Sequence, residues 1–307
     1  MLSNILIAIS ITLMYSTPLA LAAMGGVISE RSGVVNIGIE GMMSIGALAG
    51  AAVGYFSGNP WLGLLFAGIA GGLMSLFHAV ASITFRADQT VSGIALNLIG
   101  PGLALYLSRH FFGGATLTLP VPKKLPKIFD SQHLQGTAFS NFNLDVTVIL
   151  AAIVVTLTWF LLYKTKWGLR IRAMGELPHA VDTLGVSGYK TRYFCVILSG
   201  ILAGLGGGTM TLAIISQFTP TAISGQGFIA LAAVIFGKWR PFGAYAACLL
   251  FGFSQALVVM LGGGNLSVPS TLLAMIPYVL TIVMLILFVG RSSAPKASGV
   301  PYEKGAR

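Results

Sequence analysis

The sequence contains few charged residues. Charged side chains make up 8% of its 307 residues, whereas a soluble domain carries about a quarter. Hydrophobic residues make up 55%, and the mean hydropathy is +0.87. This composition excludes an ordinary soluble domain and indicates an integral membrane protein.

The motifs of several function classes are also missing. There is no basic run interleaved with aromatic residues, so a nucleic-acid partner is not expected. The two cysteines, Cys195 and Cys248, lie in apolar runs with no metal ligand at a suitable spacing, which argues against disulfides, a metal site or another cofactor. The phosphate-binding pattern GxxxxGKS or GxxxxGKT is absent, since the nearest string, FGKW at 236–239, lacks the first Gly and the hydroxyl residue. The chain is therefore not itself an ATPase, and its energy source must be a partner or an ion gradient.

An enzyme is disfavoured as well. The string GVSG at 185–188 resembles one found in intramembrane serine proteases, but it lies in a charged loop with no evident His partner on a neighbouring span.

Long apolar runs fill most of the chain. They are too long for barrel strands and do not alternate, and backbone polar groups in lipid must pair within their own segment, so we expect helices. The predicted fold is all-α, a polytopic membrane bundle of about nine crossings within a domain over 1–292, followed by a tail over 293–307. The first run has no Lys or Arg ahead of it, unlike a secretory signal, and is expected to be a retained span. The predicted spans are 3–25, 34–56, 61–85, 90–112, 145–164, 191–215, 219–237, 241–262 and 270–290.

The cations predict the orientation of these spans. On the nine-span path, 14 of the 18 Lys and Arg residues fall on one side of the membrane, and the others are Arg109, Lys123, Lys124 and Lys127. The positive-inside rule makes the richer side cytoplasmic. The N-terminus is then outside the cell membrane, the C-terminus is inside, and the loop 113–144 is external. This loop is either a connector or a docking surface for an external partner.

Two spans are predicted to be irregular. Pro220, Gly225 and Gly227 interrupt the seventh, which indicates a half-helix or a re-entrant element. Gly38 and Gly41 predict a break in the second, whose freed backbone groups we expect Asn36 and Glu40 to satisfy.

Polar residues within the spans suggest a pathway for a polar, uncharged solute. Each one singly is better explained by hydrogen bonding between helices, but as a set they predict a polar lining. Phe228 is a candidate for stacking on a ring, although a core or lipid-facing aromatic is the plainer interpretation. The candidate pathway residues are Asn36, Glu40, Asn97, Gln217, Phe228 and Gln255.

Glycines repeat at every fourth residue in two spans. Gly46, Gly50 and Gly54 form one such series, and Gly200, Gly204 and Gly208 form the other. Small residues at this spacing let helix backbones approach closely. We expect both series to pack within one subunit rather than to form a dimer face.

One long polar segment, 165–190, interrupts the apolar runs on the cytoplasmic side. Pro178 is placed to begin a short helix, Glu176 lies near its positive end, and Gly185 is a stop signal. The predicted helix of about two turns lacks a core of its own and therefore needs a partner surface. A solvated loop is the alternative, but it does not explain the Pro and Gly.

The stretch RAMGELPHAVDTLGVSGYKTRYFCVILSGILAGLGGG resembles the cytoplasmic coupling segment and following helix of permease subunits of ABC importers. The group is that of branched-chain amino acid, simple-sugar and nucleoside permeases. ERSGVVNIGIEGMMSIGA and TVSGIALNLIG are similar to the second and fourth helices of the nucleoside and simple-sugar members, in the same order along the chain. The form NIGIEGMM is closer to the nucleoside branch, and to the second of two paralogous permeases.

This resemblance implies a mechanism and a set of partners. Two permeases form a translocation path, two cytoplasmic ATPase subunits bind the coupling helices, and an extracytoplasmic binding lipoprotein delivers the solute. ATP-driven closure of the ATPases would switch the bundle between outward and inward access. Positions that match the coupling motif are Gly175, Glu176, Pro178, Ala180 and Gly185, while His179 and Asp182 occupy positions that vary in the family.

An ion-coupled secondary transporter is the alternative, because broken helices and an intramembrane Glu are also typical of that class. It would require inverted halves, and neither SGVVNIGIEGMM nor the segment 165–190 recurs in the chain.

Overall fold

The computed structural model describes residues 2–129, 142–262, 272–273, 275–288 and 294–303. Seven helical stretches in this part of the chain are long and apolar enough to cross a membrane, which confirms a polytopic helical membrane protein. The helices are α1 (Leu2–Arg31), α2 (Ile39–Ser57), α3 (Pro60–Ala79), α4 (Gln89–Phe111), α5 (Val146–Lys164), α6 (Lys166–Glu176), α7 (Pro178–Thr183), α8 (Gly188–Thr209), α9 (Gln226–Phe236), α10 (Pro241–Gly262) and α12 (Ile276–Phe288). The π-helical turns η1 (Val80–Thr84) and η2 (Met210–Ile214) extend α3 and α8.

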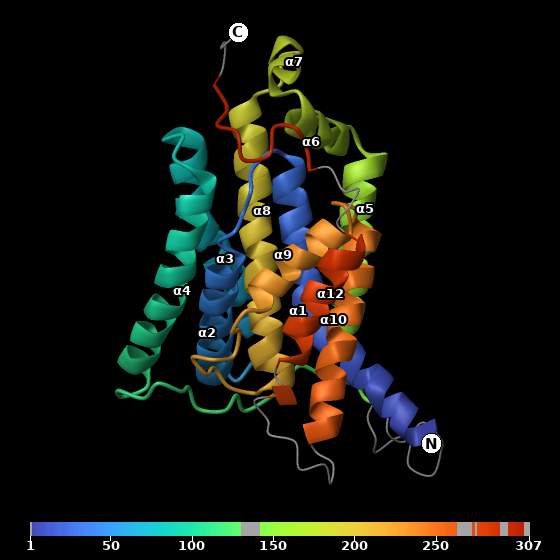
Figure 1. Ribbon diagram of the computed structural model, residues 1–307. Coiled ribbons are helices and arrows are strands. Elements are labelled where there is room, and N and C mark those ends of the chain that lie inside the picture. Colours follow the sequence, from blue (N-terminus) through green and yellow to red (C-terminus); the bar gives the residue numbers. More distant parts are fainter. Residues whose placement is uncertain (1, 130–141, 263–271, 274, 289–293, 304–307) are drawn as a thin grey trace.

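The helices are arranged around α1, α2 and α8. Helix α3 packs on α2 and α8, α4 lies at the edge of the bundle against α2, and α5 and α10 pack on α1 (Figure 1). Helices α6 and α7 lie at one end of the bundle together with the C-terminal segment. The loop after α4 and the N-terminus lie at the opposite end. The predicted external loop, 113–144, and the polar segment 165–190 therefore lie at opposite ends of the bundle.

The loop after α4 contains the only strands of the described residues. β1 (Lys127–Phe129) pairs in antiparallel fashion with β2 (Leu144–Asp145). The backbone of this loop also bonds the chain that follows η2, where the N–H of Val121 donates to the carbonyl oxygen of Ser216 at 2.8 Å. The described part of the loop before β1 is thus tied to the bundle, a feature that the sequence did not indicate.

Two predicted spans differ from continuous crossings. Residues 219–237 contain a helix only at Gln226–Phe236, and its 11 residues extend about 16 Å, roughly half of the hydrocarbon core. The predicted half-helix is therefore present, and the prediction of one crossing helix over 219–237 is wrong. In the last predicted span, 270–290, α12 is the described helix and has 13 residues.

The glycine series bring three helices into backbone contact. A Cβ atom on Gly46 would lie 2.4 Å from the carbonyl oxygen of Gly204, and one on Gly204 would lie 2.2 Å from that of Ala67. These distances are far below van der Waals contact, so only glycine fits there. The predicted packing of the glycine series within one subunit is confirmed for α2, α3 and α8.

We expect Gly204→Val to prevent correct packing, because its side chain would collide with the backbone of α3 at a cost of about 3 kcal/mol or more. The yield of monodisperse protein in detergent and its melting temperature provide the test. Gly102→Val is the matched control, since Gly102 lies on α4 with no atom within 4 Å of an added Cβ. Equal behaviour of the two variants would contradict this account.

Candidate functional site

The chain between α1 and α2 is not helical, and side chains from other helices satisfy its backbone. The break lies before α2, which begins at Ile39, rather than within a helix. Asn97 on α4 bridges it, since its Nδ2 donates to the carbonyl oxygen of Ile37 at 2.8 Å and its Oδ1 accepts from the N–H of Gly41 at 2.9 Å. The Oε1 of Gln89 accepts from the N–H of Val35 at 2.7 Å. Helix α4 thus holds the break in one conformation.

Asn36 lies inside this break and is fully buried. Its Nδ2 donates to the Oγ of Ser199 on α8 at 2.9 Å. Its Oδ1 accepts no hydrogen bond from a described residue. Asn36 therefore ties the break to α8, and it does not satisfy the freed backbone groups as we expected from the sequence.

Glu40 serves a different helix from the one predicted. Its Oε1 accepts from the N–H of Gly225 at 2.6 Å, and its Oε2 accepts from the N–H of Gly227 at 2.7 Å. The carboxylate of α2 thereby caps the N-terminus of α9, where unpaired N–H groups and the helix dipole favour a negative charge. A Cβ on Gly227 would lie 2.5 Å from the backbone nitrogen of Glu40, so this contact requires glycine. Glu40 fixes the start of the half-helix inside the bundle.

A cavity of about 370 Å³ lies beside this start of α9. Its lining residues come from α1, η2, the loop before α9, α9, α10 and α12, and none of them carries a charge. Gln226 has a buried Oε1 that accepts no hydrogen bond from a described residue. The polar lining residues are Tyr15, Thr219, Thr221, Ser224, Gln226, Gln255 and Tyr278. The cavity presents hydroxyl and amide groups to an occupant.

The predicted pathway residues are therefore distributed over three places. Gln255 lines the cavity. Asn36 and Asn97 hold the non-helical chain before α2, and Glu40 holds the start of α9. Gln217 is half-buried in the loop after η2, and the side chain of Phe228 on α9 is 50% exposed. Gln226 was missed, although its place between Gly225 and Gly227 in the seventh predicted span was a usable signal.

At the other end of the bundle, the segment 165–190 forms two helices. The predicted short helix is present as α7, with Pro178 in its first turn, and Gly185 follows it with a φ of +76°. Helix α6 was not predicted from the sequence, and its start is capped by the Oγ1 of Thr165, which accepts from the N–H of Gly168 at 3.0 Å. Gly175 at the end of α6 lies against the end of α1, because a Cβ there would be 2.3 Å from the carbonyl oxygen of Arg31.

The C-terminal segment, predicted as a simple tail, packs on these helices over Ala294–Glu303. The N–H of Ala297 donates to the carbonyl oxygen of Gly175 at 2.8 Å, and the hydroxyl of Tyr302 donates to the carboxylate of Asp182. Burial and the neighbouring Asp182 raise the pKa of Tyr302, which keeps this hydroxyl a donor. Glu303 pairs with Arg86 at 2.8 Å. Asp182 thus holds the C-terminal segment against α7 through Tyr302.

The outer surface of α7 has no such cover in the described structure. Leu177 is 65% exposed and Leu184 is 81% exposed, on either side of the helix. Glu176, His179 and Ala180 are exposed as well. The exposed side of α7 therefore carries a leucine at each end. Among the described residues, no three His, Cys, Asp or Glu side chains gather as a metal site.

Comparisons with known proteins agree on one family. The family model described as "Branched-chain amino acid transport system / permease component" matches residues 8–289. The chain is 48% identical to the guanosine ABC transporter permease protein NupQ of Bacillus subtilis, over 98% of both chains. It is 44% identical to the nucleoside ABC transporter permease protein NupC of Lactococcus lactis, over 95% of both.

A second Bacillus subtilis protein, the guanosine ABC transporter permease protein NupP, is 30% identical over 96% of this chain and 84% of its own. No solved structure gives a significant match. The matches cover nearly the whole bundle, from α1 to α12. The chain therefore belongs to the family of permease components of branched-chain amino acid transport systems, and it is a multi-pass membrane permease rather than an enzyme.

Proposed function

We propose that this chain is a transmembrane permease subunit of an ATP-binding-cassette importer for nucleosides. The similarity to NupQ and NupC over almost the full length carries this proposal. In Bacillus subtilis two different guanosine permeases, NupQ and NupP, resemble this chain at 48% and 30% identity. We therefore propose that it pairs with a paralogous permease, two ATPase subunits and an extracytoplasmic binding lipoprotein.

The chemistry of the cavity beside α9 supports a neutral, polyhydroxylated solute. Half-helix N-termini in transporters often receive an anionic group of the substrate. Here Glu40 already occupies that position, and the polar side chains that line the cavity carry uncharged hydroxyl and amide groups. Nucleosides and simple sugars present hydroxyl groups that pair with such a lining.

We place the cavity in the outer half of the bundle. Its loop residues lie next to Phe218, whose backbone bonds Thr118 in the loop after α4, at the end opposite α6 and α7. With the N-terminus outside and α7 in the cytoplasm, the solute would enter at the loop and ATPases would contact α7. The cation count favours this orientation.

ATP dependence tests the proposed class of transporter. The importer, reconstituted in proteoliposomes with its ATPase, partner permease and binding protein, should accumulate radiolabelled guanosine only when the ATPase is supplied with ATP. Uptake should survive a proton ionophore. Uptake without ATP that collapses with the ionophore would instead establish an ion-coupled transporter.

We expect Gln226→Leu and Gln255→Leu each to raise the KM for guanosine about tenfold, because each removes one amide from the cavity and its hydrogen bond to the solute. Initial uptake rates at varied solute concentration provide the measurement. Phe253→Leu is the control on α10, since the side chain of Phe253 is 49% exposed and does not line the cavity. Unchanged KM in both Gln variants would remove the cavity from the pathway.

A further inference from the structure

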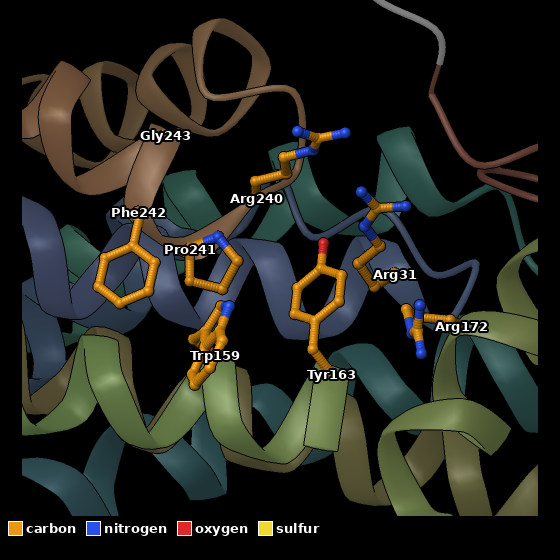
Figure 2. A pocket seen from close by; sticks show the side chains of 8 residues that line it. All are labelled: Arg31, Trp159, Tyr163, Arg172, Arg240, Pro241, Phe242 and Gly243. Carbon is orange, nitrogen blue, oxygen red and sulfur yellow. The ribbon is translucent and has the colours of Figure 1, made fainter. Parts of the chain in front are cut away.

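A second cavity, of about 610 Å³, lies at the end of the bundle that carries α6 and α7. Figure 2 shows the guanidinium groups of Arg31, Arg172 and Arg240 and the hydroxyl of Tyr163 gathered on one side of it. The rings of Trp159 and Phe242 lie toward the other side. The cavity therefore has a cationic part and an aromatic part.

The cationic part has no acidic partner among the described residues. Arg31, Arg172 and Arg240 form no ion pair there, and the neighbouring Glu30 is engaged by the indole N–H of Trp239. The Nε of Arg31 donates to the carbonyl oxygen of Trp239 at 2.9 Å, which fixes its position. The Nε of Arg172 is buried without a hydrogen-bond partner, and its guanidinium lies 4.8 Å from the ring centre of Tyr163. Three cations that line one cavity without a described counter-ion favour an anionic ligand.

The aromatic part lies on the same face of α5 as an apolar groove. Ala152 and Thr156 lie seven residues before Trp159 and Tyr163, which places all four on one face of the helix. Ala152 and Thr156, with Ile149, Ile153 and Leu157, line a groove of about 320 Å³. One face of α5 thus runs from an apolar groove to a cluster of arginines at its end.

We propose that this cavity binds the phosphate-bearing headgroup of an anionic phospholipid whose acyl chain lies in the groove on α5. Basic pockets between membrane helices, near the ends of the helices, are suited to anionic headgroups. Trp159 lies five residues before the end of α5, and the ammonium of Lys164 lies 5.5 Å from its ring centre. Trp residues near the ends of membrane helices are enriched at the membrane interface. The same phosphate chemistry also suits a soluble phosphate, but a soluble ion would make no use of the groove. This inference does not depend on the transported solute.

Native mass spectrometry of the full chain in detergent tests the proposal. Dioleoyl phosphatidylglycerol, dioleoyl phosphatidylcholine and glycerol phosphate are the three probes. We expect phosphatidylglycerol to be retained about tenfold more strongly than phosphatidylcholine, and not to be displaced by an equal concentration of glycerol phosphate. Equal retention of the two lipids, or binding of glycerol phosphate as tight as that of phosphatidylglycerol, would overturn the lipid assignment.

Two variants probe the two parts of the site separately. Arg240→Glu should weaken retention of phosphatidylglycerol about tenfold, whereas Lys166→Glu, an equal charge change on an exposed residue outside the cavity, should not. Ala152→Trp should block the groove and weaken retention with all three arginines intact. Retention that is unchanged in both Arg240→Glu and Ala152→Trp, or reduced equally by Lys166→Glu, would refute the proposal.

Discussion

Glu40→Ala is expected to abolish guanosine uptake and to lower the stability of the bundle. The substitution leaves the buried N–H of Gly227 and the partly buried N–H of Gly225 without their acceptor, at a cost of roughly 1–3 kcal/mol for the buried one and less for the other. It also removes the negative charge from the positive end of α9. Because the half-helix begins beside the polar cavity, any shift of its first turn moves Gln226 and disrupts the lining. We therefore expect the loss of uptake to be larger than the loss of folded permease indicated by the lowered melting temperature.

Glu40→Gln separates the contribution of the hydrogen bonds from that of the negative charge. A single amide oxygen can replace one of the two carboxylate oxygens, so we expect partial uptake and an intermediate melting temperature. Ser44→Ala is the control on α2, since the hydroxyl of Ser44 donates to the carbonyl oxygen of Glu40, one turn earlier in its own helix, and bonds no other described residue. Wild-type uptake by Glu40→Ala, measured in proteoliposomes with equal amounts of permease, would show that the capped half-helix is dispensable.

Much of the architecture could be predicted from local patterns. The long apolar runs specify crossing helices, because lipid forces each segment to pair its own backbone groups. The glycine series indicate close helix contacts, since the spacing itself places small residues on one stripe. Pro178 and Gly185 bound α7 through their own backbone preferences. In each case the sequence pattern and the feature that it predicts belong to the same short segment.

The parts that could not be predicted depend on contacts between distant residues. Glu40 is four residues from Asn36, and the spacing suggested a shared role, yet the carboxylate caps a helix 185 residues later. Asn97 was assigned to a pathway, but its amide matches backbone groups on both sides of the break before α2. The tail over 294–303 has no apolar periodicity. The position of Tyr302 is determined by its contacts with Asp182 and Arg192, which lie more than 100 residues earlier in the chain. No local pattern encodes these pairings.

Leu184→Asp should uncouple the permease from its ATPase while leaving the fold intact. Leu184 is 81% exposed beyond the end of α7, so its replacement costs the isolated subunit little. If a partner covers it, the variant loses the burial of a Leu side chain, roughly 1.5–3 kcal/mol, and adds the cost of burying a charge. We therefore expect at least about a tenfold loss of ATPase copurification and of ATP-driven uptake. The double variant Leu177→Asp, Leu184→Asp should bind no ATPase.

The control for this prediction lies at the same end of the molecule. Val300 is 52% exposed in the C-terminal segment, and its hydrogen bonds are made by its backbone, with its oxygen accepting from Arg192 at 3.2 Å and its N–H donating to the carbonyl oxygen of Ala297 at 3.3 Å. Val300→Asp introduces the same charge without touching α7 and should leave copurification unchanged. Equal melting temperatures for both variants would show that the loss arises at the contact. If Leu184→Asp keeps its ATPase and its uptake, then α7 is not the helix through which ATP hydrolysis reaches the bundle, and the coupling roles predicted for Gly175, Glu176, Pro178, His179, Ala180, Asp182 and Gly185 fall with it.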